Sequence, residues 1–300
     1  MTGRPGEFRN EAARARFFAA YEKALARWPE GREASDVATE FGTTRVHRHG
    51  SGARTPLVLL HGQNATSSIW APNIARLAEE RTVFAVDHVG EAGPGTQTRP
   101  IRTGEETSAW LEQVLEGLGL AEVHLGGFSY GAWIALTHTV LRPGRVVSLP
   151  LVEPPRALAP LPLEFVPGTL AVLLSGSERL QRRWFQRLAG PPQEEPADAE
   201  AQSEVGLQAM RTFRLRLPQP SRIDDAALAG IERPVLLFFG AESHAVDPKR
   251  AAARARSLLP DVRTEVVEGV GHGIPVARFN EAVPEFLREA DAQKGGTWTG

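Results

Sequence analysis

The sequence predicts an α/β fold in which a mostly parallel β-sheet is covered by helices on both faces. Short apolar runs rich in Val, Leu and Phe recur from residue 56 onward, and stretches of helical periodicity separate them. Such alternation is typical of parallel strands that are buried on both sides. The composition, 42% hydrophobic and 23% charged, supplies enough apolar material for a sizeable core. The expected strands lie in residues 56–62, 82–90, 121–129, 145–153, 234–242 and 262–269.

An amphipathic helix and a hairpin are expected before the first of these strands. Phe17, Tyr21, Leu25 and Trp28 recur at helical spacing and form one apolar stripe, and Pro29 then ends the helix. Residues that follow alternate around a glycine, which predicts a short hairpin over 38–50.

Two histidines of this hairpin, His47 and His49, would face the same side of one strand. No third ligand stands nearby in the sequence. A metal site is therefore not expected.

Helices are expected in the gaps between the strands, and a different kind of segment interrupts the alternation. Residues 154–233 carry several prolines, a helical stretch and a polar run, which favours a helical lid inserted between two core strands. The predicted division is a core of 1–153 and 234–290, a lid of 154–233 and a flexible tail of 291–300. The predicted core helices contain Trp70, Ile74 and Leu77; Leu111, Val114, Leu115 and Leu118; residues 132–141; and residues 279–287.

Global composition excludes several classes of function. The 34 basic and 36 acidic residues give a net charge of −2, so no strong field would attract nucleic acid or an anionic membrane. The absence of cysteine excludes disulfides, thiolate metal sites and a cysteine nucleophile. The N-terminal MTGRPGEFRN lacks the apolar region of a secretory signal, and no stretch approaches 18 apolar residues. A cytoplasmic protein is therefore expected.

Ser129 is the candidate nucleophile. Residues 127–131 read Gly-Phe-Ser-Tyr-Gly, the G-x-S-x-G pattern of a sharp turn whose strained serine needs small neighbours. The pattern alone would occur by chance in roughly a tenth of chains this long. Here it follows the strand-like AEVHLGG and precedes the helix-like AWIALTHTVL, so the strand–turn–helix context is met. The alternative is a serine at an ordinary turn between a strand and a helix.

His272 is the candidate base. It lies in GVGHGIP after the last expected strand, and glycines on both sides let the loop fold back over the sheet edge. A serine hydroxyl becomes a useful nucleophile when a base takes its proton, and histidine titrates in the required range. The remaining histidines in strands, helices and loops fit less well: His88, His124, His138 and His244.

An oxyanion hole is expected from two backbone amides, those of Gln63 and Tyr130. His61-Gly62-Gln63 follows a predicted strand, and Tyr130 follows the nucleophile directly. If the loop stood alone, a simple chain turn at Gly62 would explain it better.

The stretches HGQNATSSIW, AVDHVG, GGFSYGAW and GVGHG, in this order, resemble the α/β-hydrolase superfamily over nearly the whole chain. The aromatic N-terminal helix, EFGTTRVHRHG and VDHVGEAGPGTQT further resemble a bacterial branch related to naproxen-type carboxylesterases. The resemblance implies an eight-stranded, mostly parallel sheet, a lid after the sixth strand, no cofactor and an acyl-enzyme route through Ser129. Serine at the turn argues against dehalogenase and epoxide hydrolase mechanisms.

The third catalytic residue departs from the family pattern. Most relatives carry an acid three residues after the glycine that ends the seventh strand, where this chain has Ser243. We place the acid on Glu153, which ends an apolar run, because some relatives carry it there and a buried carboxylate needs a partner. Glu242 and Asp247 remain alternatives.

The sequence therefore predicts a serine hydrolase that cleaves a carboxylic ester or thioester through an acyl-enzyme. The expected partner is a small, apolar substrate, with no nucleic acid, membrane, metal or cofactor. Two alternatives stay open because fold alone does not fix function. One is a cyclase or lyase of specialised metabolism on the same scaffold. The other is a non-catalytic binding protein, which the missing acid near Ser243 favours.

Overall fold

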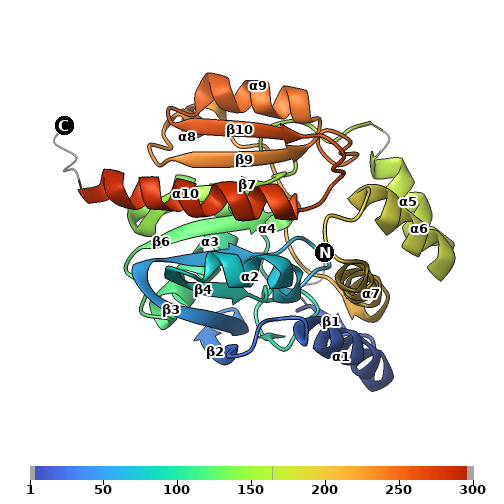
Figure 1. The fold of residues 1–300 in the computed structure, drawn as a ribbon. Helices are drawn as coiled ribbons and strands as arrows, with labels where there is room; N and C mark the ends of the chain where they lie inside the picture. The colour runs from blue at the N-terminus through green and yellow to red at the C-terminus, as the bar shows by residue number, and fades with distance from the viewer. Residues whose placement is uncertain (1–3, 164, 296–300) are drawn as a thin grey trace.

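An eight-stranded, mostly parallel sheet forms the centre of the computed structural model, which describes residues 4–163 and 165–295 (Figure 1). The strand order is β10-β9-β7-β6-β3-β2, and β4 and β5 also pair with β3. The pairs β2–β3 and β3–β5 are antiparallel, and the other pairs are parallel. The predicted α/β fold is confirmed. The strands are β2 (Glu33–Thr39), β3 (Gly42–Leu60), β4 (Arg81–Val86), β5 (Thr96–Gln97), β6 (Val123–Phe128), β7 (Val146–Val152), β9 (Val235–Gly240) and β10 (Val262–Val267).

Two hydrophobic clusters cover the two faces of this sheet. In β9, Leu237 and Phe239 belong to one cluster, whereas Leu236 and Phe238 belong to the other. Successive side chains of a strand point to opposite faces, so a strand buried on both sides reads as a continuous apolar run. Helices α3 (Gly104–Gly117), α4 (Tyr130–Leu141), α8 (Asp225–Ala229) and α9 (Pro248–Leu258) pack on the first face, and α2 (Ala71–Leu77) and α10 (Val276–Gly295) pack on the second.

The N-terminal helix α1 (Glu11–Leu25) joins the second cluster through its predicted apolar stripe. It begins at the cap Asn10, whose side chain accepts from the amide of Ala13. The helix ends at Leu25, before the predicted stop at Pro29, and Trp28 lies buried in the turn that follows. The predicted hairpin is β2–β3, and its buried His47 bonds to the Tyr21 hydroxyl at 2.7 Å.

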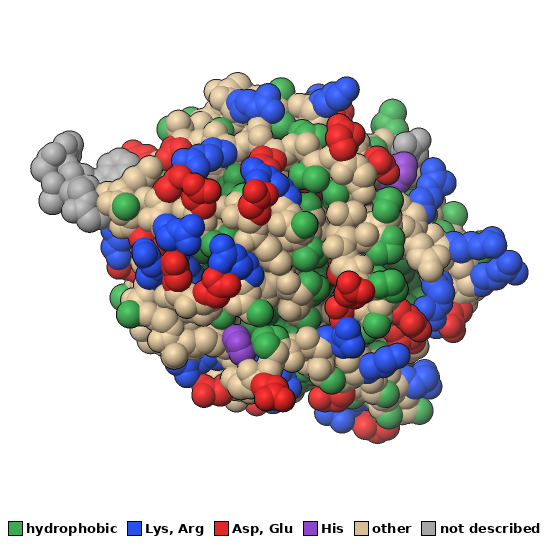
Figure 2. Space-filling view, viewed as in Figure 1, with side chains coloured by type: hydrophobic (Ala, Val, Ile, Leu, Met, Phe, Trp, Pro, Cys, Tyr) green, Lys and Arg blue, Asp and Glu red, His purple; other side chains and the backbone are tan. Residues whose placement is uncertain are grey.

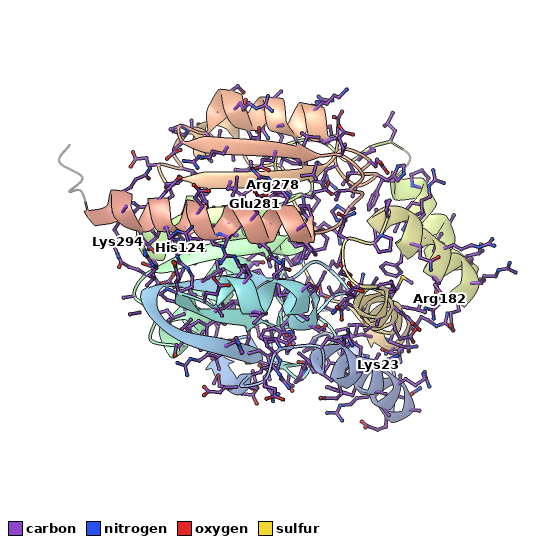
Figure 3. All side chains as sticks on the ribbon, viewed as in Figure 1. Lys23, His124, Arg182, Arg278, Glu281 and Lys294 are labelled. Atoms are coloured by element: carbon purple, nitrogen blue, oxygen red, sulfur yellow. The ribbon has the colours of Figure 1, made fainter. Side chains whose placement is uncertain are left out.

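Within residues 154–233, helices α5 (Phe165–Ser175), α6 (Glu178–Ala189) and α7 (Pro196–Thr212) lie outside the sheet layers, and α7 lies next to α1 (Figure 1). The last helix of this segment, α8, packs on the sheet instead. Arg182 of α6, labelled in Figure 3, donates to Glu204 of α7 at 2.8 Å and joins these two helices. A short strand pair, β1 (Glu7–Phe8) with β8 (Phe213–Arg214), ties the end of this segment to the N-terminus. The domain division remains a prediction.

The C-terminal helix differs from expectation. Helix α10 continues to Gly295, into the segment 291–300 that was expected to be a flexible tail, and residues 296–300 lie outside the described part. Asp291 explains the extension, because its carboxylate bonds to buried His124 of β6 at 3.0 Å.

Acidic and basic side chains are interspersed on the face in Figure 2. No described helix is long and apolar enough to span a membrane.

Candidate active site

Ser129 stands at a sharp turn between β6 and α4. Its φ of 51° and ψ of −116° place it in a strained backbone conformation that L-residues rarely adopt. Two backbone hydrogen bonds hold the turn: the Ser129 amide donates to the Val152 carbonyl at 2.8 Å, and the Trp133 amide donates to the Ser129 carbonyl at 3.1 Å. The strand–turn–helix arrangement predicted around this serine is therefore present.

The two glycines of the turn are required by close backbone contacts. A Cβ atom added to Gly131 would lie 2.2 Å from the carbonyl oxygen of Leu60, and one added to Gly127 would lie 2.5 Å from the carbonyl carbon of Gly131. Both separations are far shorter than non-bonded atoms tolerate. Only glycine lets the helix start this close to the neighbouring strand.

His272 bonds to Ser129 through one ring nitrogen and to Glu153 through the other. Nε2 lies 2.8 Å from the Ser129 Oγ atom, and Nδ1 is hydrogen-bonded to the Glu153 Oε2 atom. A carboxylate can only accept, so Nδ1 carries a proton and Nε2 of the neutral ring is free to accept from the serine hydroxyl. The backbone of His272 is also held, because its amide donates to the Leu188 carbonyl of α6 at 2.8 Å.

Glu153 is fully buried at the end of β7, and three groups satisfy its carboxylate. The Gly240 amide donates to Oε1 at 2.8 Å, and the Ser243 hydroxyl donates to Oε2 at 2.8 Å, beside the bond from His272. The structure thus brings together Ser129, His272 and Glu153 from three distant parts of the chain. Ser243, at the position where most relatives carry the acid, binds the acid instead.

The two alternative acids lie in other environments. Glu242 is exposed, and Asp247 is exposed at the start of α9, where its carboxylate caps the helix by accepting from the Arg250 amide at 3.0 Å. Two of the histidines that fit the base less well are held in the core: His124 by Ser148 and Asp291, and His138 by Ser108.

The loop after β3 lies against the nucleophile. A Cβ atom on Gly62 would lie 3.3 Å from the Ser129 Cβ atom, so there is no room for a side chain between them. The amide of Tyr130 is the first of α4 and has no acceptor within the helix. In the described ranges the amide of Gln63 donates to no backbone acceptor. Neither amide has a hydrogen-bond acceptor among the described residues, which an oxyanion hole requires.

Buried polar side chains hold this loop in place through hydrogen bonds, a role that the sequence analysis did not assign to any of them. Nδ1 of His61 donates to the Gly62 carbonyl at 2.8 Å, and Nε2 accepts from the His88 amide at 3.1 Å. Burial lowers the pKa of His61, which keeps the ring neutral as these bonds require. Glu91, also buried, accepts from the Asn64 amide at 3.0 Å. The signal available in the sequence was the acidic residue Glu91 within the glycine-rich loop HVGEAGPG.

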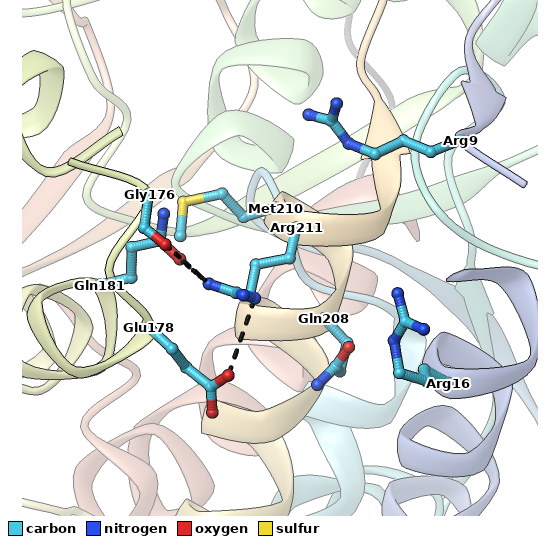
Figure 4. Close-up of a pocket in the computed structure, with 8 residues that line it drawn as sticks. All are labelled: Arg9, Arg16, Gly176, Glu178, Gln181, Gln208, Met210 and Arg211. Carbon is cyan, nitrogen blue, oxygen red and sulfur yellow. Dashed lines mark hydrogen bonds and ion pairs between the residues drawn. The ribbon is translucent and has the colours of Figure 1, made fainter. Parts of the chain in front are cut away.

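A separate cavity of about 530 Å³ lies between α1, α7 and the start of α6 and does not include the serine site (Figure 4). One of its three arginines, Arg211, is already bonded to Gln181 and paired with Glu178. The described residues contain no cluster of three His, Asp or Glu side chains placed to hold a metal ion. The cavity is lined by Arg9, Arg16, Gly176, Glu178, Gln181, Gln208, Met210 and Arg211.

Comparison with known proteins agrees with this fold. The sequence model of the Alpha/beta hydrolase family matches residues 57–286. Carboxylesterase YbfK of Bacillus subtilis (strain 168) is 28% identical over 281 residues, which cover 91% of this chain and 93% of that protein. A second protein of that strain, "Uncharacterized carboxylesterase nap", is 27% identical and covers 91% and 92%. The crystal structure of naproxen esterase from Bacillus subtilis matches with a TM-score of 0.83 at 27% identity, over 91% of this chain and 97% of that one.

Proposed function

We propose that this chain, which belongs to the alpha/beta hydrolase family, is a serine hydrolase that cleaves a small carboxylic ester through an acyl-enzyme on Ser129. The single observation that carries the proposal is the continuous hydrogen-bond chain from the Ser129 hydroxyl through His272 to Glu153. Such a chain activates a serine, because the histidine takes the proton as the oxygen attacks. The carboxylesterase relatives support an ester as the substrate.

Acylation starts when the Ser129 Oγ atom attacks the ester carbonyl carbon and its proton passes to Nε2 of His272. The backbone amides of Gln63 and Tyr130 donate to the oxyanion of the tetrahedral intermediate. When the intermediate collapses, the alcohol leaves with the proton from Nε2, and the acyl group stays on Ser129. Glu153 holds the imidazole orientation and stabilises the imidazolium that forms transiently.

Deacylation repeats these steps with water. His272 takes a proton from water, the hydroxide oxygen attacks the acyl carbon, and the Ser129 oxygen leaves and recovers the proton. A carboxylic acid is released and the enzyme returns to its initial state. Every group named in these steps belongs to the chain or to the substrates.

Residues 154–233 act as a lid in this proposal. The amide of His272 donates to Leu188 of α6, and Gly206 of α7 packs near the carbonyl of Asn64, where an added Cβ atom would lie 3.4 Å away. The segment therefore contacts both loops that carry the site.

A thioester is the alternative substrate, since the same steps would cleave it.

Catalysis is favoured over a purely non-catalytic binding role by the satisfied carboxylate of Glu153. A buried acid bonded to the histidine compensates for the missing acid at Ser243, which was the feature that favoured a binding protein. A receptor would gain nothing from a buried acid that orients a base toward a serine.

The experiment is a kinetic cycle on Ser129 and His272 with a p-nitrophenyl acyl ester. Either alanine substitution alone should lower kcat by several orders of magnitude, and the double variant should fall little further, because the two residues act as a unit. Ser257→Ala, an exposed serine on α9, is the matched control and should keep the wild-type rate. Wild-type turnover in Ser129→Ala, or additive losses in the double variant, would contradict the proposal.

A further inference from the structure

The loop between β4 and β5 places a buried acid against the oxyanion loop. Glu91 is only 4% exposed, and its Oε2 atom accepts from the amide of Asn64 at 3.0 Å. Asn64 follows Gln63 directly, and Gln63 supplies one of the two proposed oxyanion amides. Glu91 therefore contacts the peptide unit next to the group that would bind the transition state.

Asn64 needs this support because its backbone is strained. Its φ of 59° lies in the left-handed region, which asparagine tolerates better than other residues with a side chain but which is still less favourable than the right-handed region. The Ala65 amide donates to the Gly62 carbonyl at 3.1 Å and closes a tight turn around Gln63 and Asn64. The bond from Asn64 to Glu91 fixes the orientation of the Gln63–Asn64 peptide. That peptide and the Gln63 amide are parts of the same tight turn, so a bond that anchors the turn at Asn64 restrains the segment that carries the Gln63 amide.

Burial of the Glu91 carboxyl group at this position is energetically unfavourable, so we expect the group to have a function. The second oxygen, Oε1, is buried and has no hydrogen-bond partner among the described residues. Burial raises the pKa of Glu91 to about 8, so the group is mostly uncharged at neutral pH. His88, stacked on His61 beside it, has two buried ring nitrogens that also lack partners in the described structure. Apolar side chains would fill this space at lower cost.

We infer that Glu91 is a positioning residue for the oxyanion hole: by accepting from the Asn64 amide, it holds the Gln63 amide toward the substrate oxygen. The inference rests on the proposed function, because it assigns a task within that reaction. Glu91 does not touch the substrate in this account. It acts through Asn64 and Gln63 alone.

Three substitutions separate this task from a structural one. Glu91→Gln keeps a carbonyl acceptor on a side chain of the same length. Glu91→Leu removes the acceptor and keeps a similar side-chain size. Glu91→Asp shortens the side chain by one methylene group and so moves the acceptor away from the Asn64 amide. Gln97→Leu is the control, since Gln97 is another buried polar residue after β4 whose bond goes to Gly6 and not to the oxyanion loop. All assays are run well below each variant's melting temperature with a p-nitrophenyl acyl ester.

If Glu91 positions the oxyanion hole, its substitution should weaken binding of the transition state and leave binding of the substrate nearly unchanged. Loss of one oxyanion donor costs about 100-fold to 1,000-fold in kcat, so misplacing one should cost about tenfold to 100-fold. We expect that loss in Glu91→Leu and Glu91→Asp, with KM changed by less than about threefold because ground-state binding makes little use of the hole. A trifluoromethyl ketone, which forms an anionic adduct on the serine, should lose affinity by the same factor as kcat. Glu91→Gln and Gln97→Leu should retain kcat within about threefold.

Wild-type kcat and ketone affinity in Glu91→Leu or Glu91→Asp would overturn the inference. So would an equal loss in Glu91→Gln, because the acceptor would then not be the property that matters. If Glu91→Leu does not fold, Glu91→Asp and Glu91→Gln decide the result. Ser129→Ala is measured alongside: an inactive Ser129→Ala with a fully active Glu91→Leu refutes this inference alone, whereas an active Ser129→Ala refutes the proposed function.

Discussion

Glu153 directly follows β7 with a φ of 49°, an unusual backbone conformation for a residue with a long side chain. Its amide donates to the Phe238 carbonyl at 3.0 Å, so pairing with β9 holds the backbone in place. The turn directs the carboxylate along the carboxyl edge of the sheet toward His272. Strain of this kind costs on the order of 1–3 kcal/mol and persists where surrounding contacts enforce it.

Removal of the Glu153 charge should lower turnover far more than removal of either alternative acid. Glu153→Gln should reduce kcat by about 100-fold to 10,000-fold, because an amide leaves the wrong tautomer of His272 favoured. Glu242→Gln and Asp247→Asn should stay within about twofold, since neither acid contacts the site in the structure. Side-by-side initial rates with one ester substrate check this. A near wild-type rate in Glu153→Gln would move the acid elsewhere.

At the scale of elements, the turn from β6 into α4 determines where the nucleophile stands. Gly131→Ala should destabilise the protein by about 1–3 kcal/mol, because the new methyl group would overlap the Leu60 carbonyl, and it should also lower kcat by displacing Ser129. Gly144→Ala is the matched control: nothing lies within 4 Å of its added Cβ atom, and its φ is not positive. It should be neutral or stabilising by less than about 1 kcal/mol. Urea unfolding measures both.

An equal stability of the two alanine variants would mean that the close approach of α4 to β3 is not a real constraint. Loss of stability in Gly144→Ala alone would contradict the account more strongly, because that site has open space.

Elements whose signal is local were predictable from the sequence. The buried strands appear as continuous apolar runs, and the G-x-S-x-G turn has a backbone requirement that the residues themselves reveal. The bond between Glu153 and His272 joins residues 119 positions apart, and only strand order decides which acid meets the histidine. For the same reason Glu91 and the donation from Ser243 were not foreseen. The extension of α10 depends on Asp291 meeting His124 across the fold.

At the scale of the whole molecule, buried histidines make stability depend on pH. Burial lowers the pKa of His61, His88, His124 and His138, the last to about 4. Each folded-state pKa lies below the value of about 6.5 expected in the unfolded chain. Their contribution to stability is therefore present above pH 6.5 and is lost as the pH falls toward and through the folded-state values.

Glu91 changes the pH dependence of stability in the direction opposite to that of the histidines. Its pKa rises to about 8 in the folded protein, so its contribution is present below about pH 4.5 and is lost as the pH rises through 8. We expect the free energy of unfolding to be highest near pH 6–7 and to fall on both sides. Thermal melts from pH 4.5 to 9 measure this. Glu91→Gln should flatten the alkaline side and steepen the fall between pH 6.5 and 4.5, because Glu91 opposes the histidines in that range. A stability that stays constant from pH 7 to 4.5 would show that the buried histidines are not held neutral.

The most direct test of the central claim is covalent labelling with a fluorophosphonate, followed by mass spectrometry of the intact protein and its peptides. A fluorophosphonate reacts with a serine that a neighbouring base activates. The account predicts one adduct per chain, located on Ser129, absent in Ser129→Ala and formed at least about 100-fold more slowly in His272→Ala. An unlabelled wild-type protein, or an adduct on a serine other than Ser129, would contradict it.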